Sequence, residues 1–440
     1  MVRSLRDLLV SVLIAFALLA AGEVALRVRA IVDGDALAAH LEAERLAGTR
    51  FRHPFLEYTA ATNFRGMTRL SQDPTRKFYV RTNSEGFRTH EFYPKMPGRY
   101  RVVALGDSFT MGNDANQDET WPAVLESLLQ QNVSPDVEVF SLGVGSYSGV
   151  RYAELARLYF DLLQPDLVIV AVDQSDFAED VERIQSYELD EDGVPLVLKN
   201  WREYVSEEDA PDTVRYMDAS RKLRLAEKKA TFVDHLRAGS LLVDGILGWV
   251  DSRGAAAERD GLLRRRDDYL RDASTAPVKT YAELLAAAKD GDFGAAMPPV
   301  LRGDVIPLTL ERAKQAYEPT VRCLRFVRDR AAAHGARVYF TSYPYPYMVS
   351  VKEAVPFQLK NFGAVYDLRA DRVHPRLMDW IAGSLGVPHL DAYPVFEKDP
   401  DGKYGDLDQH FNAAGYAAYA RFLYDAIHDQ VAGDLAARRH

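Results

Sequence analysis

The chain has 440 residues, of which 47% are hydrophobic and 27% charged, so it can bury one large core and carry additions to it. Its formal net charge of -10 provides no attraction for the phosphates of nucleic acid, and we expect no nucleic-acid partner. The single cysteine, Cys323, excludes an intramolecular disulfide, and no Cys and His residues have the spacing of zinc ligands, so no metal site is expected.

Residues 1–30 predict a membrane anchor. Arg3 and Arg6 precede an uncharged run from Leu8 to Gly22, which is shorter than the ~20 residues that cross a bilayer but is extended by Val24 to Leu26. A cleaved signal peptide and a buried core helix are the alternatives, although no Ala-x-Ala site ends the run. We expect an uncleaved, single-pass transmembrane helix in the lipid bilayer, with the bulk of the chain extracytoplasmic, in the periplasm or outside the cell.

Residues 31–100 predict a linker and an N-terminal extension. The stretch from Ile31 to Thr49 is rich in Ala, Glu and Leu, which is typical of a polar helix. From Phe51 to Tyr100 the sequence is aromatic and basic with many turn signals, which indicates short strands and loops packed on a main domain.

The main domain is predicted from alternating apolar runs and helical patterns. Strand-like runs occur at Arg101 to Leu105, Val137 to Leu142, Asp166 to Val172 and Arg337 to Ser342, with helical patterns at Trp121 to Gln131 and Gly149 to Leu163. This alternation predicts an α/β fold with a parallel sheet covered on both faces. We assign this domain to residues 101–182 and 313–432. The charge-dense residues 183–312 between the two parts predict a helical insertion that caps the crevice at the strand ends.

The segment RVVALGDSFTMG contains a candidate nucleophile, Ser108. An ordinary turn in which Asp107 or Ser108 caps the following helix would have the same letters. However, Ser108, Gly143 and residues 173–176 each follow the carboxyl end of a predicted strand, and parallel sheets place their sites there. A nucleophilic serine needs a histidine base, an acid and oxyanion donors.

The segment DQHFNAAG supplies a candidate base, His410, immediately before a helix that Asn412 can cap. In extended backbone Asp408 points the same way as His410, so it can orient the imidazole and stabilise its charged form. A capping or surface histidine is the alternative.

These segments together resemble the SGNH hydrolases, also called the GDSL esterase and lipase superfamily. The resemblance is carried by LGDSFTMG around Ser108, SLGVGSY around Gly143, AVDQSDF around Ser175 and DQHFNAAG around His410, and it extends from Asn83 to Ile427. TNSEGFR and ETWPAVL are similar to segments of anchored bacterial members. The resemblance implies a flavodoxin-like three-layer sandwich, Ser108 as nucleophile, His410 as base, and backbone N–H groups of Ser108 and Gly143 in the oxyanion hole.

The chain departs from the family pattern in two blocks. The third block usually reads Gly-x-Asn-Asp with the Asn side chain as an oxyanion donor, and here Ser175 stands at the Asn position. We expect the Ser175 hydroxyl to be a weaker donor, since it is shorter than an amide and can rotate. The last block usually has Asp three residues before the histidine, where this chain has Leu407. Asp408 is the expected triad acid, as in the Asp-x-His variant of polysaccharide-modifying relatives, and Asp406 is the competing candidate.

The expected function is a serine esterase or acyltransferase that acts on an ester, an O-acyl (acetyl) group on a glycan or cell-envelope polysaccharide, and that needs no cofactor. The alternative is a non-catalytic carbohydrate-binding or scaffold protein of envelope-polysaccharide assembly. The departure at Ser175 favours this alternative, whereas the presence of both Ser108 and His410 argues against it.

Overall fold

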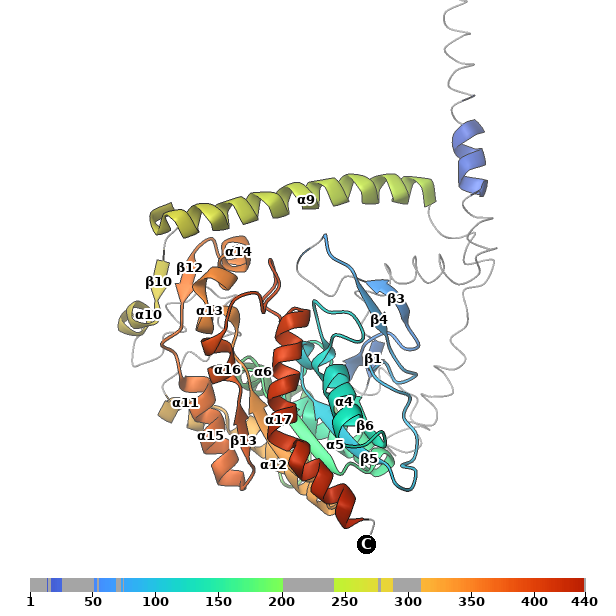
Figure 1. Cartoon of the computed structure of the whole chain (residues 1–440), viewed down its shortest axis with the longest axis vertical. Coiled ribbons are helices and arrows are strands. Elements are labelled where there is room, and N and C mark those ends of the chain that lie inside the picture. Colours follow the sequence, from blue (N-terminus) through green and yellow to red (C-terminus); the bar gives the residue numbers. More distant parts are fainter. Residues whose placement is uncertain are drawn as a thin grey trace, which may run out of the picture.

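A parallel sheet of five strands forms the centre of the protein (Figure 1). The computed structural model describes residues 14, 17–25, 51–53, 55–68, 73, 75–200, 241–275, 278–287 and 310–438. In spatial order the strands are β13 (His389–Asp391), β11 (Arg337–Ser342), β7 (Leu167–Ala171), β5 (Tyr100–Leu105) and β6 (Val137–Ser141). All neighbouring strands run parallel. The α/β class is therefore confirmed, and β13 is the strand that was not predicted from the sequence.

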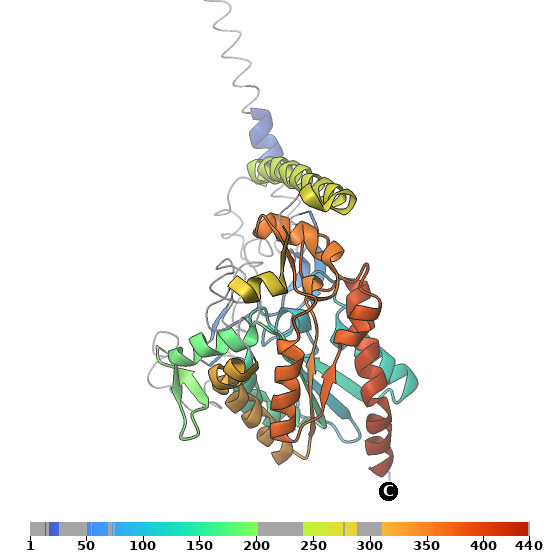
Figure 2. The same ribbon diagram turned by 90° about the vertical axis from the view of Figure 1, so that its left-hand side faces the viewer.

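Successive residues of each strand enter different cores, which makes the domain a three-layer structure. In β5, Val102 and Ala104 belong to one apolar cluster, whereas Val103 and Leu105 belong to the other. The first cluster is covered by α4 (Trp121–Asn132), α16 (Tyr393–Lys398) and α17 (Ala413–Ala437). The second is covered by α5 (Gly149–Leu163), α12 (Glu318–Ala333) and α15 (Val373–Leu385). Burial on both faces explains why β7 is apolar throughout and β5 nearly so, and Figures 1 and 2 show the helices on both sides.

The N-terminal extension consists of short antiparallel strand pairs beside the sheet. They are β1 (Phe51–His53) with β2 (Glu57–Thr59), and β3 (Arg65–Thr68) with β4 (Phe78–Arg81). Short strands and loops are what the turn-rich composition of this region predicted.

The region between β7 and β11 contains additional elements. They are α6 (Asp176–Arg183), a 3-10 turn (Ile184–Ser186), β8 (Tyr187–Leu189), β9 (Pro195–Leu198), α9 (Leu241–Arg271), a second 3-10 turn (Ala273–Thr275), β10 (Val278–Thr280), α10 (Tyr281–Ala287) and α11 (Leu310–Ala316). The long helix α9 lies across one end of the domain (Figure 1). Its Leu262 is buried, and its Tyr269 packs in an apolar cluster with Val355, Leu359 and Val365. These three residues belong to the segment after β11, which holds α13 (Pro346–Val349), α14 (Val351–Asn361) and β12 (Val365–Asp367).

Most of the predicted anchor lies outside the described residues. Residues 17–25 are helical. Within the described part of the chain, no helix is both long enough and apolar enough to cross a membrane. The anchor therefore stays a prediction, as do the domain boundaries, because residues 26–50, 201–240 and 288–309 are also outside the described residues.

The loop after β6 depends on Gly143, and we expect Gly143→Ala to destabilise the protein. A Cβ at this position would lie 2.5 Å from the backbone nitrogen of Met111 and 2.6 Å from Thr110 Cβ, in the short helix α3 (Ser108–Met111). Backbone atoms cannot rotate away, so the free energy of unfolding should fall by about 1–3 kcal/mol. Gly383→Ala is the matched control: a Cβ there meets no heavy atom within 4 Å on the exposed side of α15, and a gain of ~0.5–1 kcal/mol is expected. Urea unfolding measures both, and an equal effect at the two sites would contradict the close approach.

Candidate active site

Ser108 is the first residue of α3 and directly follows the tight turn at the carboxyl end of the central strand β5. Asp107 caps α3 by accepting a hydrogen bond from the Phe109 N–H at 2.9 Å. Gly106 is required there, because a Cβ would collide with the Thr110 side chain. The turn leaves Ser108 half-buried, so its hydroxyl can be reached from outside the core.

His410 and Asp408 come from the loop before α17 and meet Ser108 at this strand end. Ser108 Oγ lies 2.6 Å from His410 Nε2, and His410 Nδ1 lies 2.5 Å from Asp408 Oδ1. Both ring nitrogens are therefore engaged, one by a hydroxyl and the other by a buried carboxylate. Ser108, His410 and Asp408 have the geometry of a catalytic triad. The serine–histidine contact of this triad joins residues 302 positions apart.

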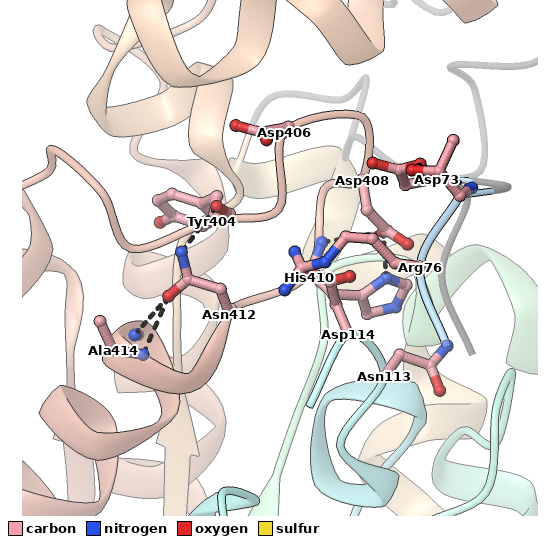
Figure 3. A network of polar contacts seen from close by, with 12 residues as sticks. Asp73, Arg76, Asn113, Asp114, Tyr404, Asp406, Asp408, His410, Asn412 and Ala414 are labelled. Atoms are coloured by element: carbon pink, nitrogen blue, oxygen red, sulfur yellow. Dashed lines mark hydrogen bonds and ion pairs between the residues drawn. The ribbon is translucent and has the colours of Figure 1, made fainter. Parts of the chain in front are cut away.

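The loop that carries the triad acid and base is fixed at both ends. Asn412 caps α17 by accepting hydrogen bonds from the Ala414 and Gly415 N–H groups, and its own amide donates to Tyr404 O at 2.9 Å (Figure 3). Tyr404 and Phe411 also form an isolated antiparallel bridge. The capping signal in the sequence thus holds the triad loop as well as beginning the helix.

Asp406, the competing acid, does not contact the imidazole of the triad. Its Oδ2 accepts a hydrogen bond from Arg259 of α9 at 2.6 Å, and its side chain is 43% exposed. Figure 3 shows Asp408 beside His410 and Asp406 farther along the loop. The geometry therefore favours Asp408.

The electrostatic surroundings of the triad favour the charged form of His410. Burial lowers its pKa, but the charge of Asp408 and the hydrogen bond to it more than offset this effect. The charges of Asp107 and Asp114 act in the same direction as Asp408, and the net result raises the pKa of His410 to about 9. The resting imidazole thus holds its proton to a higher pH than an ordinary histidine.

Two backbone donors lie close to the Ser108 turn. Within the described residues, neither the Ser108 N–H nor the Gly143 N–H donates to a protein acceptor. The Gly143 loop packs on α3, and a Cβ on Gly145 would lie 3.8 Å from Ser108 Cβ. Tyr58 of the N-terminal extension supports this loop by donating to Gly145 O at 2.9 Å.

Ser175, the third predicted oxyanion donor, is half-buried at the start of α6. Its N–H donates to Asp173 Oδ1 at 2.7 Å. The backbone of Ser175 is thus fixed by the side chain of Asp173.

Several side chains support the site without having been predicted. The buried Arg88 donates to Gly112 O at 2.7 Å and to Ala115 O at 2.9 Å, which holds the chain after α3. Tyr343 and Tyr345, which follow β11, donate to Asp107 and Asp173 at 3.0 and 2.6 Å. Arg88 lies in the segment TNSEGFR, and the two tyrosines lie in the segment YPYPYM. Neither segment indicates by its sequence which distant groups these side chains contact.

A second Ser-His-Asp arrangement occurs away from the triad. Ser342 Oγ lies 2.9 Å from His389 Nε2, and His389 Nδ1 lies 2.7 Å from Asp379 Oδ1. Ser342 is completely buried, so no substrate can reach it in this conformation. In the part of the chain that the structure describes, no group of three or more His, Cys, Asp or Glu side chains is placed to hold a metal ion.

Among known proteins, only solved structures match this chain, and the matches include esterases and lipases. Neither protein-family models nor curated protein sequences match the chain. It is similar to a protein assigned to the G-D-S-L lipolytic family from Desulfitobacterium hafniense, with 13% identity over 74% of this chain and 99% of that one and a TM-score of 0.32. A catalytic mutant of an acetylxylan esterase from Geobacillus stearothermophilus is 12% identical over 74% and 94% of the two chains, with a TM-score of 0.32. A GDSL-like lipase from Bacteroides thetaiotaomicron is 10% identical over 76% and 91%, with a TM-score of 0.31. TM-scores of 0.31 to 0.32 are too low to support an argument about function. The function proposed below therefore rests on the geometry of this chain.

The raised pKa of His410 makes the stability of the protein depend on pH, and His410→Asn should reveal this. The folded-state pKa of about 9 is above the ordinary value of 6.5. The stabilisation is therefore fully present below pH 6.5 and is lost as the pH rises through about 9. Relative to the variant, the wild type should lose about 3 kcal/mol of unfolding free energy between pH 6 and pH 9.5. Urea unfolding of both proteins at the two pH values measures this, and a constant difference would contradict the assignment.

Proposed function

We propose that this protein is a serine hydrolase of carboxylic esters of the SGNH type. The observation that carries the proposal is the hydrogen-bonded chain from Ser108 through His410 to Asp408, at the carboxyl end of a central parallel strand. This order of nucleophile, base and orienting acid activates a hydroxyl for acyl transfer.

In the proposed reaction, Ser108 Oγ attacks the ester carbonyl while Nε2 of the neutral form of His410 takes its proton, so the enzyme is active in the fraction of molecules in which His410 has lost its own proton. Asp408 holds the imidazole in the required tautomer and stabilises the imidazolium that forms. The tetrahedral intermediate collapses to an acyl-enzyme, and His410 gives the proton to the departing alcohol. Water, or a second alcohol in the case of acyl transfer, then attacks the acyl group by the same steps in reverse order.

The oxyanion hole is proposed to consist of the backbone N–H groups of Ser108 and Gly143, with Ser175 as a weaker donor. The two N–H groups support this assignment because they donate to no other described group and belong to loops that pack together. Ser175 would contribute through its hydroxyl, which can rotate toward the substrate. Each preorganised donor of this kind contributes ~3 kcal/mol to lowering a reaction barrier.

The substrate is proposed to be an O-acyl (acetyl) group on a glycan or envelope polysaccharide, hydrolysed or transferred outside the cytoplasm by an enzyme anchored through residues 1–30. This part of the proposal is supported by the resemblance of the four sequence blocks and by the predicted anchor.

An active-site fluorophosphonate should label Ser108, and Ser108→Ala should abolish labelling and lower kcat toward an aryl acetate by about 10⁴ or more, since triad members act as a unit. Ser342→Ala is the matched control, because Ser342 has the same kinds of partners but is buried. It should retain labelling and turnover. Peptide mapping by mass spectrometry identifies the labelled serine. No labelling of the folded wild type would instead favour the non-catalytic binding or scaffold role.

Asp408→Asn and Asp406→Asn should separate the two acids. Loss of the Asp408 carboxylate removes the group that orients His410 and should lower kcat by about 10⁴. Asp406→Asn breaks a partly exposed ion pair with Arg259 and should lower kcat by less than about tenfold. Steady-state kinetics on an aryl acetate compares them, and a larger loss for Asp406→Asn would reverse the assignment.

A further inference from the structure

The loop after β6 makes a turn beside the candidate nucleophile. Tyr147 N–H donates to Val144 O at 3.0 Å, which closes a four-residue turn. Gly145 and Ser146 are the two central residues of this turn, and both are half-buried. A Cβ on Gly145 would lie 3.8 Å from Ser108 Cβ, so the turn forms part of the wall of the site.

The backbone of this turn is of type II. Ser146 has a φ of 60°, whereas Gly145 does not have a positive φ, and this combination is that of a type II turn. Glycine or asparagine is favoured at the third position, because other residues adopt a positive φ only at a cost. Serine is therefore unusual there, and contacts from outside the turn must hold it in this form.

The alternative for such a turn is type I, in which the central peptide is reversed. The two types differ mainly in ψ of the second residue and φ of the third, so the Gly145–Ser146 peptide can turn over while the chain on both sides stays in place. Because the N–H and C=O groups of a trans peptide point in opposite directions, this reversal exchanges the positions of Gly145 O and Ser146 N–H. In type I both central residues have a negative φ, which removes the cost at Ser146.

Tyr58 holds the central peptide in its observed orientation. Its hydroxyl donates to Gly145 O at 2.9 Å and lies 3.5 Å from Ser146 O. In return, the Tyr147 hydroxyl donates to Tyr58 O at 2.5 Å, and the two rings have their centroids 5.7 Å apart. Both tyrosines are buried. Reversal of the peptide would break the hydrogen bond to Gly145 O, so the Tyr58 hydroxyl favours the type II turn.

The Tyr58 ring is fixed from α5 as well as from the turn. The guanidinium of Arg151 lies 5.2 Å from the centroid of the Tyr58 ring and 5.6 Å from that of Tyr147. Arg151 is buried, and its Nε donates to Leu56 O at 3.1 Å, two residues before Tyr58. The hydroxyl of Tyr58 therefore has a fixed position against which the turn is held.

We propose that Tyr58 is a positioning residue of the reaction: its hydroxyl prevents reversal of the Gly145–Ser146 peptide, so that the C=O faces the N-terminal extension and the N–H faces the other side, beside Ser108. The inference rests on the proposed hydrolase function. Attack by Ser108 places negative charge on the carbonyl oxygen of the ester, which a nearby N–H stabilises and a nearby peptide oxygen repels. Reversal of this peptide would put its oxygen in the place of its N–H and raise the barrier without changing the triad.

Tyr58→Phe tests the proposal because it removes the hydroxyl and keeps the ring. Gly145 O then faces an apolar ring edge, and the turn can reverse to the type I form that Ser146 favours. We expect kcat for an aryl acetate to fall about tenfold with KM unchanged, less than the ~10²–10³ for loss of an oxyanion donor, because the Ser108 and Gly143 N–H groups stay in place. The rising limb of the pH profile should stay at the same pH, since the hydrogen bonds within the triad are kept. Steady-state kinetics measures this, with folding verified by circular dichroism.

Tyr187→Phe is the matched control. Tyr187 of β8 is buried, and its hydroxyl donates to Phe55 O at 2.8 Å, in the same extension but not on the turn. This variant loses one buried hydrogen bond of the same kind, so its free energy of unfolding should fall as for Tyr58→Phe, whereas kcat should stay within about twofold of the wild type. An equal loss of kcat in the two variants would overturn the proposal, because attachment of the extension would then control the rate.

The double variant Tyr58→Phe/Ser146→Gly separates the orientation of the peptide from other effects of the missing hydroxyl. Glycine adopts a positive φ without the cost that serine has, so the type II turn is favoured again although the hydroxyl is absent. The double variant should recover about fivefold in kcat relative to Tyr58→Phe, and Ser146→Gly alone should stay within about twofold of the wild type. A double variant no more active than Tyr58→Phe would overturn the proposal.

Fluorophosphonate labelling distinguishes failure of this inference from failure of the proposed function. An unchanged kcat for Tyr58→Phe in a protein that labels at Ser108 refutes this inference alone. A folded wild type that does not label refutes the hydrolase proposal and this inference with it.

Discussion

The hydrogen bond between Ser108 and His410 is the interaction on which the function of this structure depends, and it joins two loops from opposite ends of the chain. Neither loop could hold this geometry alone. The β5–α3 turn is fixed by the sheet and by its glycine, and the loop before α17 is fixed by packing of the following helix. Tyr416, at the start of α17, donates to Asn113 O at 2.8 Å, directly after α3. The aromatic side chains of α17 also pack on the core face that α4 covers, so burial of apolar area supplies the energy that keeps the two loops together.

The site gathers far more negative than positive charge in a buried place. Asp107, Asp173 and Asp176 are buried close to several tyrosines, and the charge of His410 acts on Asp107 and Asp173. Such a cluster is costly when fully ionised, so protons must be shared within it. The tyrosines have a function in this arrangement. Their hydroxyls donate hydrogen bonds that fix which oxygen of each carboxyl is available, and they add no charge.

The sequence predicts the parts of this structure that depend on local patterns. Central strands buried on both faces are apolar runs, and α5 begins and ends at the predicted residues, because its periodicity and its flanking turns are local. β13, with three residues of mixed polarity, has no such pattern. The choice between Asp406 and Asp408 required the turn geometry of the loop, which two neighbouring aspartates in a sequence do not specify. The contacts from Tyr343 and Tyr345 to their acids cross 236 and 172 positions, so no spacing rule could have found them.

The additions to the sheet contribute no triad residue, yet they restrict the loops that do. Tyr58 and Arg88 of the N-terminal extension donate to Gly145 O in the loop after β6 and to Gly112 O after α3. Arg259 of α9 joins Asp73 of the extension to Asp406 of the triad loop, with Nε–Oδ2 and Nη2–Oδ2 distances of 2.9 and 2.6 Å. A partly exposed ion pair of this kind contributes only ~0.2–1 kcal/mol to global stability. Its effect on local opening is larger in proportion, because the free energy of opening one loop is much smaller than that of unfolding the whole domain. The insertion and the extension therefore act on the same quantity, the fraction of time in which His410 stays within hydrogen-bonding distance of Ser108.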